Sequence, residues 1–217
     1  MASTVLSIQT GRIAPLGPNA VPSAFAKSCV KGRVAVGQLG LECDEQADPI
    51  AHGGPDKAVY GYSAEHYGVW ASDYPEHSAA FRGGGFGENL TIFGLTEADL
   101  CVGDVHGIGS ARLQVCQPRQ PCFKLALYFD DNRLPKAMVR NGRAGWYYRV
   151  LEEGVITAGD AVTLVERPNP EFAFDRLVEI VNFRSASGAE IAAMATISGI
   201  ADWLRDAARS RDRKFAA

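Results

Sequence analysis

The sequence lacks the spacings that mark several common classes of metal and disulfide proteins. Its five cysteines are an odd number, are widely spaced and include no Cys-x-x-Cys pair. No His-x-x-x-His or His-Glu-x-x-His pair is present either. A zinc finger, a disulfide framework and a histidine-ligated metal hydrolase are therefore not indicated. The Gly-x-x-x-x-Gly-Lys-Ser/Thr motif is also missing, so nucleotide hydrolysis is not supported.

The chain also has little net charge and no long apolar run. A net charge of −3 over 217 residues provides no cationic field that would hold a nucleic acid or an anionic membrane. No stretch approaches the roughly 18 apolar residues that cross a membrane, and the first residues lack the basic region of a targeting segment. The sequence therefore predicts a reduced, cytoplasmic, soluble protein that binds neither nucleic acid nor membrane.

What the chain does contain, up to about residue 166, is a series of short apolar or alternating segments separated by glycine. Their spacing is typical of a mainly antiparallel sheet that folds on itself as a barrel with helical insertions. One inserted helix is predicted from an N-cap at Ser63 to Trp70, and another from Pro135 to Asn141 with Gly142 as its C-cap. The predicted strands are residues 5–8, 33–36, 58–62, 89–93, 104–108, 112–116, 146–151 and 161–165.

Two prolines, Pro168 and Pro170, interrupt this pattern, because they cannot continue a central strand. We therefore predict a barrel domain over residues 1–167 and a small three-helix domain over residues 168–217. Acidic and basic residues nearly balance in the second part, which disfavours a helix bundle that reads DNA. Its apolar residues recur at helical spacing: Leu177, Ile180, Val181, Ile191, Met194, Ile200, Trp203 and Leu204.

Residues 117–124, Gln-Pro-Arg-Gln-Pro-Cys-Phe-Lys, present a single cysteine from a stiff segment. The prolines fix their own φ and press the preceding residues towards extended conformations. Positive charge on Arg119 and Lys124, if it reaches the sulfur, favours the thiolate, which is the form that attacks or ligates. Cys122 is therefore a candidate nucleophile or metal ligand. The alternative is an ordinary buried cysteine in a loop.

Two glycine-rich segments accompany Cys122. Residues 52–58, His-Gly-Gly-Pro-Asp-Lys-Ala, use Gly53 and Gly54 to allow a close backbone approach and present Lys57 at the start of a strand. Residues 83–90 place four glycines around one aromatic residue, where accessible amides could wrap an anion. The candidate binding residues of this second segment are Phe86, Gly87 and Asn89. Each segment can equally be a simple turn or flexible loop.

Two further residues complete the set of candidates. Arg143 lies on a glycine turn before an aromatic strand and suits bidentate binding of phosphate or carboxylate. His52, beside the glycine pair, is the histidine most suited to proton transfer, because its reference pKa is close to neutral. A Cys122–His52 dyad acting as a metal-free hydrolase stays open as an alternative.

Taken together and in this order, these segments resemble the MOSC domain family, named for the C-terminal domain of molybdenum-cofactor sulfurases, and within it the YiiM-like branch. The resemblance covers nearly the whole chain, and it is the joint occurrence of the motifs that makes it specific. Cys43 departs from the pattern, which has glycine before the aspartate. The motifs that carry the resemblance are residues 40–48, 52–58, 85–90, 94–99, 117–124 and 142–147.

This resemblance implies a MOSC-type β-barrel that binds the molybdenum cofactor, a molybdopterin carrying molybdenum, with Cys122 as the protein's ligand to the metal. A soft thiolate suits a thiophilic metal, and the pterin phosphate needs cations and backbone amides around it. Lys57, Arg119, Lys124 and Arg143 would supply the charge, and the glycine loops would supply the amides. Binding of pyridoxal phosphate is left open.

The implied activity is reduction of N-hydroxylated compounds, such as hydroxylaminopurine bases or amidoximes, in a detoxifying role. His52 is the expected proton donor. The sequence shows no flavin, haem or iron–sulfur motif, so a separate reductase protein is expected to supply electrons. The alternative is a carrier of molybdenum cofactor or sulfur without turnover of its own. A symmetric homodimer is the default expectation for the assembly.

Overall fold

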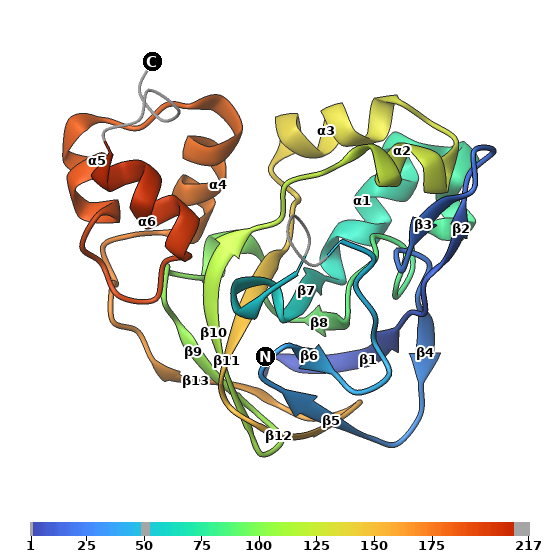
Figure 1. Ribbon diagram of the computed structural model, residues 1–217, viewed down its shortest axis with the longest axis horizontal. Helices are drawn as coiled ribbons and strands as arrows, with labels where there is room; N and C mark the ends of the chain where they lie inside the picture. Colours follow the sequence, from blue (N-terminus) through green and yellow to red (C-terminus); the bar gives the residue numbers. More distant parts are fainter. Residues whose placement is uncertain (1, 49–52, 211–217) are drawn as a thin grey trace.

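The computed structural model describes residues 2–48 and 53–210 (Figure 1). Its largest element is an eight-stranded sheet in the order β13-β9-β10-β11-β7-β8-β1-β4, in which β7 and β8 are parallel and the other pairs are antiparallel. The strands of this sheet are β1 (Thr4–Thr10), β4 (Ser28–Val30), β7 (Val59–Ser63), β8 (Leu90–Phe93), β9 (Val105–Ile108), β10 (Ala111–Pro118), β11 (Trp146–Glu152) and β13 (Val162–Glu166).

Two smaller sheets complete the β structure. One is three-stranded, in the order β12-β5-β6, and the other is the two-stranded pair β2-β3. The predicted strands are all observed, whereas most of the strands in the smaller sheets are too short to produce a period-2 pattern. The strands of the two smaller sheets are β2 (Ala14–Leu16), β3 (Val21–Ser23), β5 (Arg33–Gly37), β6 (Gly40–Leu41) and β12 (Gly154–Thr157), of which β5 was predicted.

The main sheet coils so that the start of β1 approaches the start of β13, the strand at the opposite end of the sheet. The two strands do not pair along their length, so the barrel is not fully closed. Thr4 forms a single bridge with Ala161, directly before β13, and the amide of Val5 donates to the carbonyl oxygen of Asp160 at 3.0 Å. The later residues of β1 pair with β4 instead. On its other edge β1 pairs with β8, and that pairing shifts register between Val5 and Ser7. The mainly β fold with helical insertions is confirmed, as a coiled mixed sheet in place of a fully closed barrel.

Helices inserted between the strands cover the upper part of the sheet in Figure 1. They are α1 (Glu65–Asp73), α2 (Phe123–Phe129) and α3 (Arg133–Asn141), with short 3-10 turns η1 (Pro55–Lys57), η2 (Pro75–Ala80) and η3 (Glu97–Asp99). The predicted C-cap Gly142 is confirmed, with φ of 70°. The predicted N-cap Ser63 is wrong, because Ser63 still pairs with Ile92 of β8 and Ala64 takes the cap position. Helix α2 was not predicted.

The three predicted C-terminal helices are present as α4 (Phe174–Phe183), α5 (Gly188–Met194) and α6 (Asp202–Arg209). They pack closely against the sheet. A Cβ on Gly199 would lie 2.5 Å from the Cα of Gly103, and Asn169 donates to the carbonyl oxygens of Val102 and Ser198 at 2.7 and 2.9 Å. The predicted boundary at residues 167/168 lies between β13 and α4, and the independence of the two parts stays a prediction.

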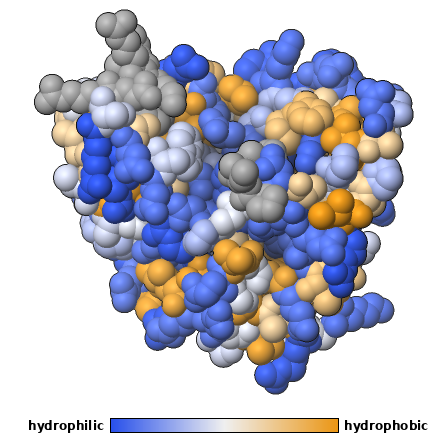
Figure 2. Space-filling view, viewed as in Figure 1, coloured by the Kyte–Doolittle hydropathy of each residue, from blue (hydrophilic) through white to orange (hydrophobic). Residues whose placement is uncertain are grey.

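Hydrophilic residues cover most of the face shown in Figure 2, and the exposed hydrophobic residues form small separate groups on it. The large apolar side chains lie inside, with Trp70, Trp146, Tyr62, Tyr148 and Phe86 all fully buried. Within the described part of the chain, no helix combines the length and the apolar character that a membrane crossing would require.

Cys43, where the family pattern has glycine, adopts a positive φ of 65°. A side chain disfavours this left-handed conformation, which glycine adopts freely. We predict that Cys43→Gly raises the free energy of unfolding by about 0.5 kcal/mol, the relief of strain outweighing the added freedom of the unfolded chain. Urea denaturation measures this change. Cys29→Gly, in the middle of β4, is the matched control and should lower stability; a loss at both positions would contradict the argument.

Candidate functional site

Cys122 lies between the end of β10 and the start of α2. It is the N-cap residue of α2, with an extended backbone (φ −117°, ψ 173°), and its carbonyl oxygen accepts the amide of Leu125 at 3.1 Å. Pro118 ends the strand and Pro121 directly precedes the cysteine. The side chain is partly exposed. The stiff segment therefore presents the thiol at a junction between strand and helix.

The thiol borders an open pocket with a cavity volume of about 100 Å³. Seven of the candidate residues line this pocket together: Lys57, Phe86, Gly87, Asn89, Arg119, Cys122 and Lys124. The other lining residues were not named as candidates, although five of them lie in motifs that the sequence analysis singled out: Asp44, Gln46, Ala47, Gln120 and Tyr147. The remaining ones are Ser23, Ala24, Phe25, Lys27 and Tyr60.

Arg119 is a buried cation in the wall of this pocket, with 5% of its surface exposed. Its guanidinium carbon lies 5.5 Å from the ring centroid of Phe25 and 5.3 Å from that of Tyr60. Its Nη1 atom donates to the sulfur of Met138 at 3.3 Å. Within residues 2–48 and 53–210, no carboxylate forms an ion pair with it.

The surroundings of Arg119 keep it charged. Burial by itself lowers the pKa of Arg119, but the oxygens of Tyr60 and Tyr147 and the sulfur of Cys122 raise it above its usual value. A buried charge without a counter-charge is costly to desolvate. The pocket is therefore suited to an anionic ligand that would supply the missing negative charge.

A buried ion pair between Lys27 and Asp44 supports the same pocket. Both side chains are 7% exposed, and burial lowers the pKa of Lys27 although Asp44 opposes the shift. Asn89 holds this pair in place: its Nδ2 atom donates to Asp44 Oδ2 at 2.8 Å, and its Oδ1 atom accepts the amide of Tyr60 at 3.0 Å. The amide group of Asn89 is thus used within the protein, and it fixes the pocket wall.

The loop that carries Lys57 forms another side of the pocket. Gly54, with φ of 87°, precedes η1, and its carbonyl oxygen accepts the amide of Lys57 at 3.0 Å. Burial lowers the pKa of Lys57, and Asp48 and Asp56 oppose this shift. Gly53 and Gly54 are not among the residues that line the pocket. Their contribution is to bring the chain into the turn that presents Lys57.

In the second glycine-rich loop, the backbone amides of residues 84–87 all donate hydrogen bonds to acceptors within the protein. Those of Gly84 and Phe86 donate to the carboxylate of Glu88 at 2.7 and 2.9 Å, and those of Gly85 and Gly87 donate to carbonyl oxygens of residues 82 and 84. The expectation that this loop wraps an anion with its amides is therefore not supported. The carboxylate of Glu88, which is five residues after Gly83 in the chain, already occupies the position that such an anion would take.

Phe86 is fully buried and stacks on Tyr62, with 4.6 Å between the ring centroids and 24° between the ring planes. It also contacts the rings of Trp70 and Phe129, at 5.3 and 5.9 Å between centroids. The loop thus fastens the pocket to the aromatic core under α1 and α2.

The carboxylate of Glu88 holds this loop in its conformation, because it accepts two of the loop's amides and the hydroxyl of Tyr67. Burial raises its pKa, while the hydroxyl of Tyr67 and the loop amides lower it. In Glu88→Gln an NH₂ group would face one or more of these donors and leave them unsatisfied, so we predict a loss of about 2 kcal/mol in the free energy of unfolding. Thermal and urea denaturation measure it. Glu166→Gln on exposed β13 is the control and should change stability by about 0.5 kcal/mol or less.

The structure does not bring Arg143 to Cys122. Its Nη1 atom pairs with Asp73 Oδ2 at 2.8 Å, and its guanidinium lies over the ring of Trp70 at 5.4 Å. It lines a separate pocket between α3 and α4 together with His66 and other residues. Arg143 therefore secures the turn before β11 and lies outside the cysteine pocket.

His52 lies outside the described residues. The other three histidines each have a partner: His66 Nε2 lies 2.7 Å from Glu97 Oε2, His77 Nε2 lies 3.0 Å from Asp131 Oδ2, and His106 Nδ1 lies 2.8 Å from the hydroxyl of Tyr148. Burial lowers the pKa of His106 to about 4. It is therefore a neutral core residue at physiological pH.

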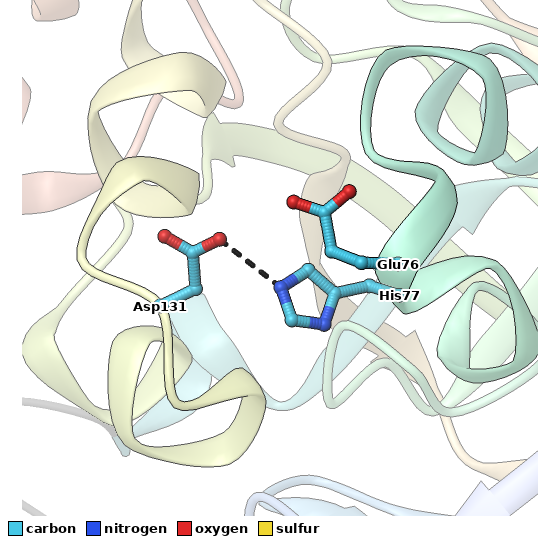
Figure 3. Close-up of side chains that lie close together, drawn as sticks. All are labelled: Glu76, His77 and Asp131. Carbon is cyan, nitrogen blue, oxygen red and sulfur yellow. Dashed lines mark hydrogen bonds and ion pairs between the residues drawn. The ribbon is translucent and has the colours of Figure 1, made fainter.

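Glu76, His77 and Asp131 form the one group of three close metal-ligating side chains among the described residues (Figure 3). Arg133 already occupies this group: its Nη2 atom pairs with Glu76 and lies 2.6 Å from Asp131 Oδ2, and its Nε atom bonds Asp131 Oδ1 at 3.0 Å. A positive side chain thus neutralises both carboxylates. We interpret the group as an ion-pair network that joins η2 to the turn between α2 and α3.

Comparisons with known proteins show a match to the MOSC domain over residues 48–163. Protein YiiM from Escherichia coli (strain K12) is 43% identical over 162 residues, which cover 75% of this chain and 72% of that protein. A protein named Reductase from Gibberella moniliformis (strain M3125 / FGSC 7600) is 34% identical over 212 residues, covering 96% of this chain and 37% of that protein. The crystal structure of YiiM from Geobacillus stearothermophilus superposes with a TM-score of 0.81 at 34% identity, covering 99% of this chain and 100% of that one.

Proposed function

The chain belongs to the MOSC domain family, and from this premise we propose that it is a molybdenum-cofactor-dependent reductase of N-hydroxylated compounds. Hydroxylaminopurine bases and amidoximes are the proposed substrates, and detoxification is the proposed role. The observation that carries the proposal is a pocket in which a partly exposed cysteine borders a buried arginine without a carboxylate partner among the described residues. The name of one relative, Reductase, supports the reaction class, although the chain spans only 37% of that protein.

The side chains of the pocket fit this cofactor in charge and in ligand type. The sulfur of Cys122 is a soft ligand of the kind that suits a thiophilic metal. Arg119, Lys57 and Lys124 place positive charge around the same space, as the phosphate of the pterin requires. When bound, the cofactor would supply metal-centred two-electron redox chemistry. Cys122 would hold the metal and Arg119 would hold an anionic part of the pterin.

The remaining roles belong to the protein. Tyr60 and Tyr147, with 5.2 Å between their ring centroids, line the pocket beside Arg119, and we propose that they limit the access of water to its charge. The oxygen removed from the substrate must leave as water, so a proton donor is required, and His52 is the residue that we propose. A separate reductase protein is proposed as the electron donor, and a homodimer as the assembly.

Elemental analysis combined with an activity assay tests the proposal. Protein purified from a host that makes the cofactor should contain stoichiometric molybdenum and, once reduced by a dye, should reoxidise when hydroxylaminopurine is added. Protein from a host that cannot make the cofactor is the control. Molybdenum without reoxidation would identify a carrier instead. Hydrolase activity of a molybdenum-free protein would favour the Cys122–His52 dyad.

A further inference from the structure

A second hollow adjoins the cysteine pocket on the side of the C-terminal helices. It shares Lys57, Gln120, Cys122 and Tyr147 with the first pocket, so that Cys122 lies on the boundary between the two. Among the described lining residues, Trp203 of α6 is the contribution of the C-terminal helices. Cys122 therefore lies between the cationic pocket and a second hollow that is lined by the side chain of Trp203.

Trp203 belongs to the apolar residues that recur at helical spacing in the last helix, and it is 38% exposed. Its indole Nε1 atom donates to Gln117 Oε1 at 2.6 Å. Gln117 is buried, and its Nε2 atom donates to the carbonyl oxygen of Asp56 at 2.7 Å. Gln117 begins the stiff segment that ends at Cys122. A single buried amide thus fixes the edge of the indole relative to the cysteine.

The helix that carries Trp203 is itself fastened to the pocket. Asp56 Oδ2 accepts the amide of Asp202 at 2.8 Å, while Asp56 Oδ1 accepts Arg149 Nε at 2.7 Å. The amide of Ala201 also donates to the carbonyl oxygen of Cys116 on β10 at 3.0 Å. Two of these bonds hold the start of α6 against η1 and the sheet, and the bond from Arg149 fixes the carboxylate of Asp56 that makes one of them. Trp203 is therefore a rigid part of the wall.

We propose that Trp203 is a specificity-determining residue that stacks on the planar ring of a nitrogen heteroaromatic substrate whose N-hydroxyl group faces Cys122. This inference rests on the proposed function for the reaction itself. A fixed, partly exposed indole offers a flat face that stabilises a stacked base and gives little to a non-planar, aliphatic compound. Lys57, Gln120 and Tyr147 lie around the same hollow and supply hydrogen-bonding groups for the edge of the ring.

Tryptophan fluorescence tests the stacking without any turnover. Of the three tryptophans, Trp70 and Trp146 are fully buried, so an added base reports through Trp203. Titration of the cofactor-loaded protein with adenine, a planar base without an N-hydroxyl group, should quench the emission of the wild type and leave that of Trp203→Phe unchanged. Equilibrium dialysis of adenine should show binding about tenfold weaker in Trp203→Leu and largely retained in Trp203→Phe.

Kinetics then separate specificity from a structural role. Trp203→Leu should raise the KM for hydroxylaminopurine about tenfold, with kcat nearly unchanged, and should leave both constants for acetamidoxime, an aliphatic amidoxime, close to wild type. Asp206→Ala, an exposed change on the same helix, is the matched control.

The outcomes also distinguish this inference from the proposed function. Equal changes in KM for both substrates, or no quenching by adenine, would overturn the stacking role of Trp203 while reductase activity stands. Quenching by adenine in a protein that reduces neither substrate would support the stacking site and reject the reductase.

Discussion

Cys122→Ser is expected to purify with less than about a tenth of the wild-type molybdenum and to reduce no N-hydroxylated substrate. A neutral hydroxyl is a harder and weaker ligand for a thiophilic metal than a thiolate, so the bond between protein and metal would be lost. Molybdenum content per chain and dye reoxidation measure the two effects. The loss of the metal should be the larger and the primary one.

The fold should survive this substitution. Cys122 is the N-cap of α2, a position that serine occupies well because its hydroxyl can accept an amide of the first turn. Thermal unfolding of the ligand-free variant should therefore match that of the wild type or exceed it by up to about 0.5 kcal/mol. Cys29→Ser, an exposed change in β4, is the matched control and should keep full molybdenum. Full molybdenum and activity in Cys122→Ser would show that Cys122 is not the ligand.

The strands were predictable because their signal is local, whereas the closure of the sheet was not. Period-2 alternation and glycine spacing depend on neighbouring residues, and they identified every long strand. Closure depends on how β1 divides one edge between residues 160–162 and β4, and this division is a long-range pairing that no local pattern encodes. Helix α2 was missed because the short apolar run Phe123–Phe129 has no period that distinguishes a helix from a strand.

The candidate site was predictable where one short segment carries it. Arg119, Cys122 and Lys124 belong to one stiff segment, and they line one pocket. The ion pair of Lys27 with Asp44 could not be predicted, since the partners are far apart in the sequence and neither belongs to a motif that requires the other. Arg143 was predicted to bind an anion because it lies on a glycine turn, but its guanidinium pairs with Asp73 and lies over the ring of Trp70, outside the cysteine pocket.

Loops rich in glycine showed the limit of reasoning from accessible amides. Four glycines around Phe86 do free the backbone, but the nearby Glu88 supplies an internal carboxylate that takes two of the amides. A sequence motif cannot show whether an anion-binding loop binds a ligand or its own side chain. The buried cation of Arg119 is the more informative feature, because the described residues offer it no carboxylate partner.

Arg119→Met should bind the cofactor at least about 30-fold more weakly and yet make the ligand-free protein more stable. Removing a buried charge that pairs with a ligand costs about 2–5 kcal/mol of binding, and 2 kcal/mol corresponds to about 30-fold. In the ligand-free protein the same charge is desolvated without a carboxylate, so an apolar side chain of similar length should add about 1 kcal/mol of stability. The ring contacts with Phe25 and Tyr60 limit this gain, because they already stabilise the guanidinium.

Two measurements on each protein test the two parts of the Arg119→Met prediction, weaker cofactor binding and higher stability of the ligand-free protein. Molybdenum retained after dialysis reports binding, and thermal unfolding of protein from a host without the cofactor reports intrinsic stability. Loading with cofactor should raise the melting temperature of the wild type, because the ligand binds the folded state alone, and should leave that of the variant nearly unchanged. Arg112→Met, which removes an exposed arginine paired with Glu152, is the matched control and should alter neither measurement appreciably. If Arg119→Met retained the cofactor and lost stability, Arg119 would be a structural residue and the anion would bind through the lysines alone.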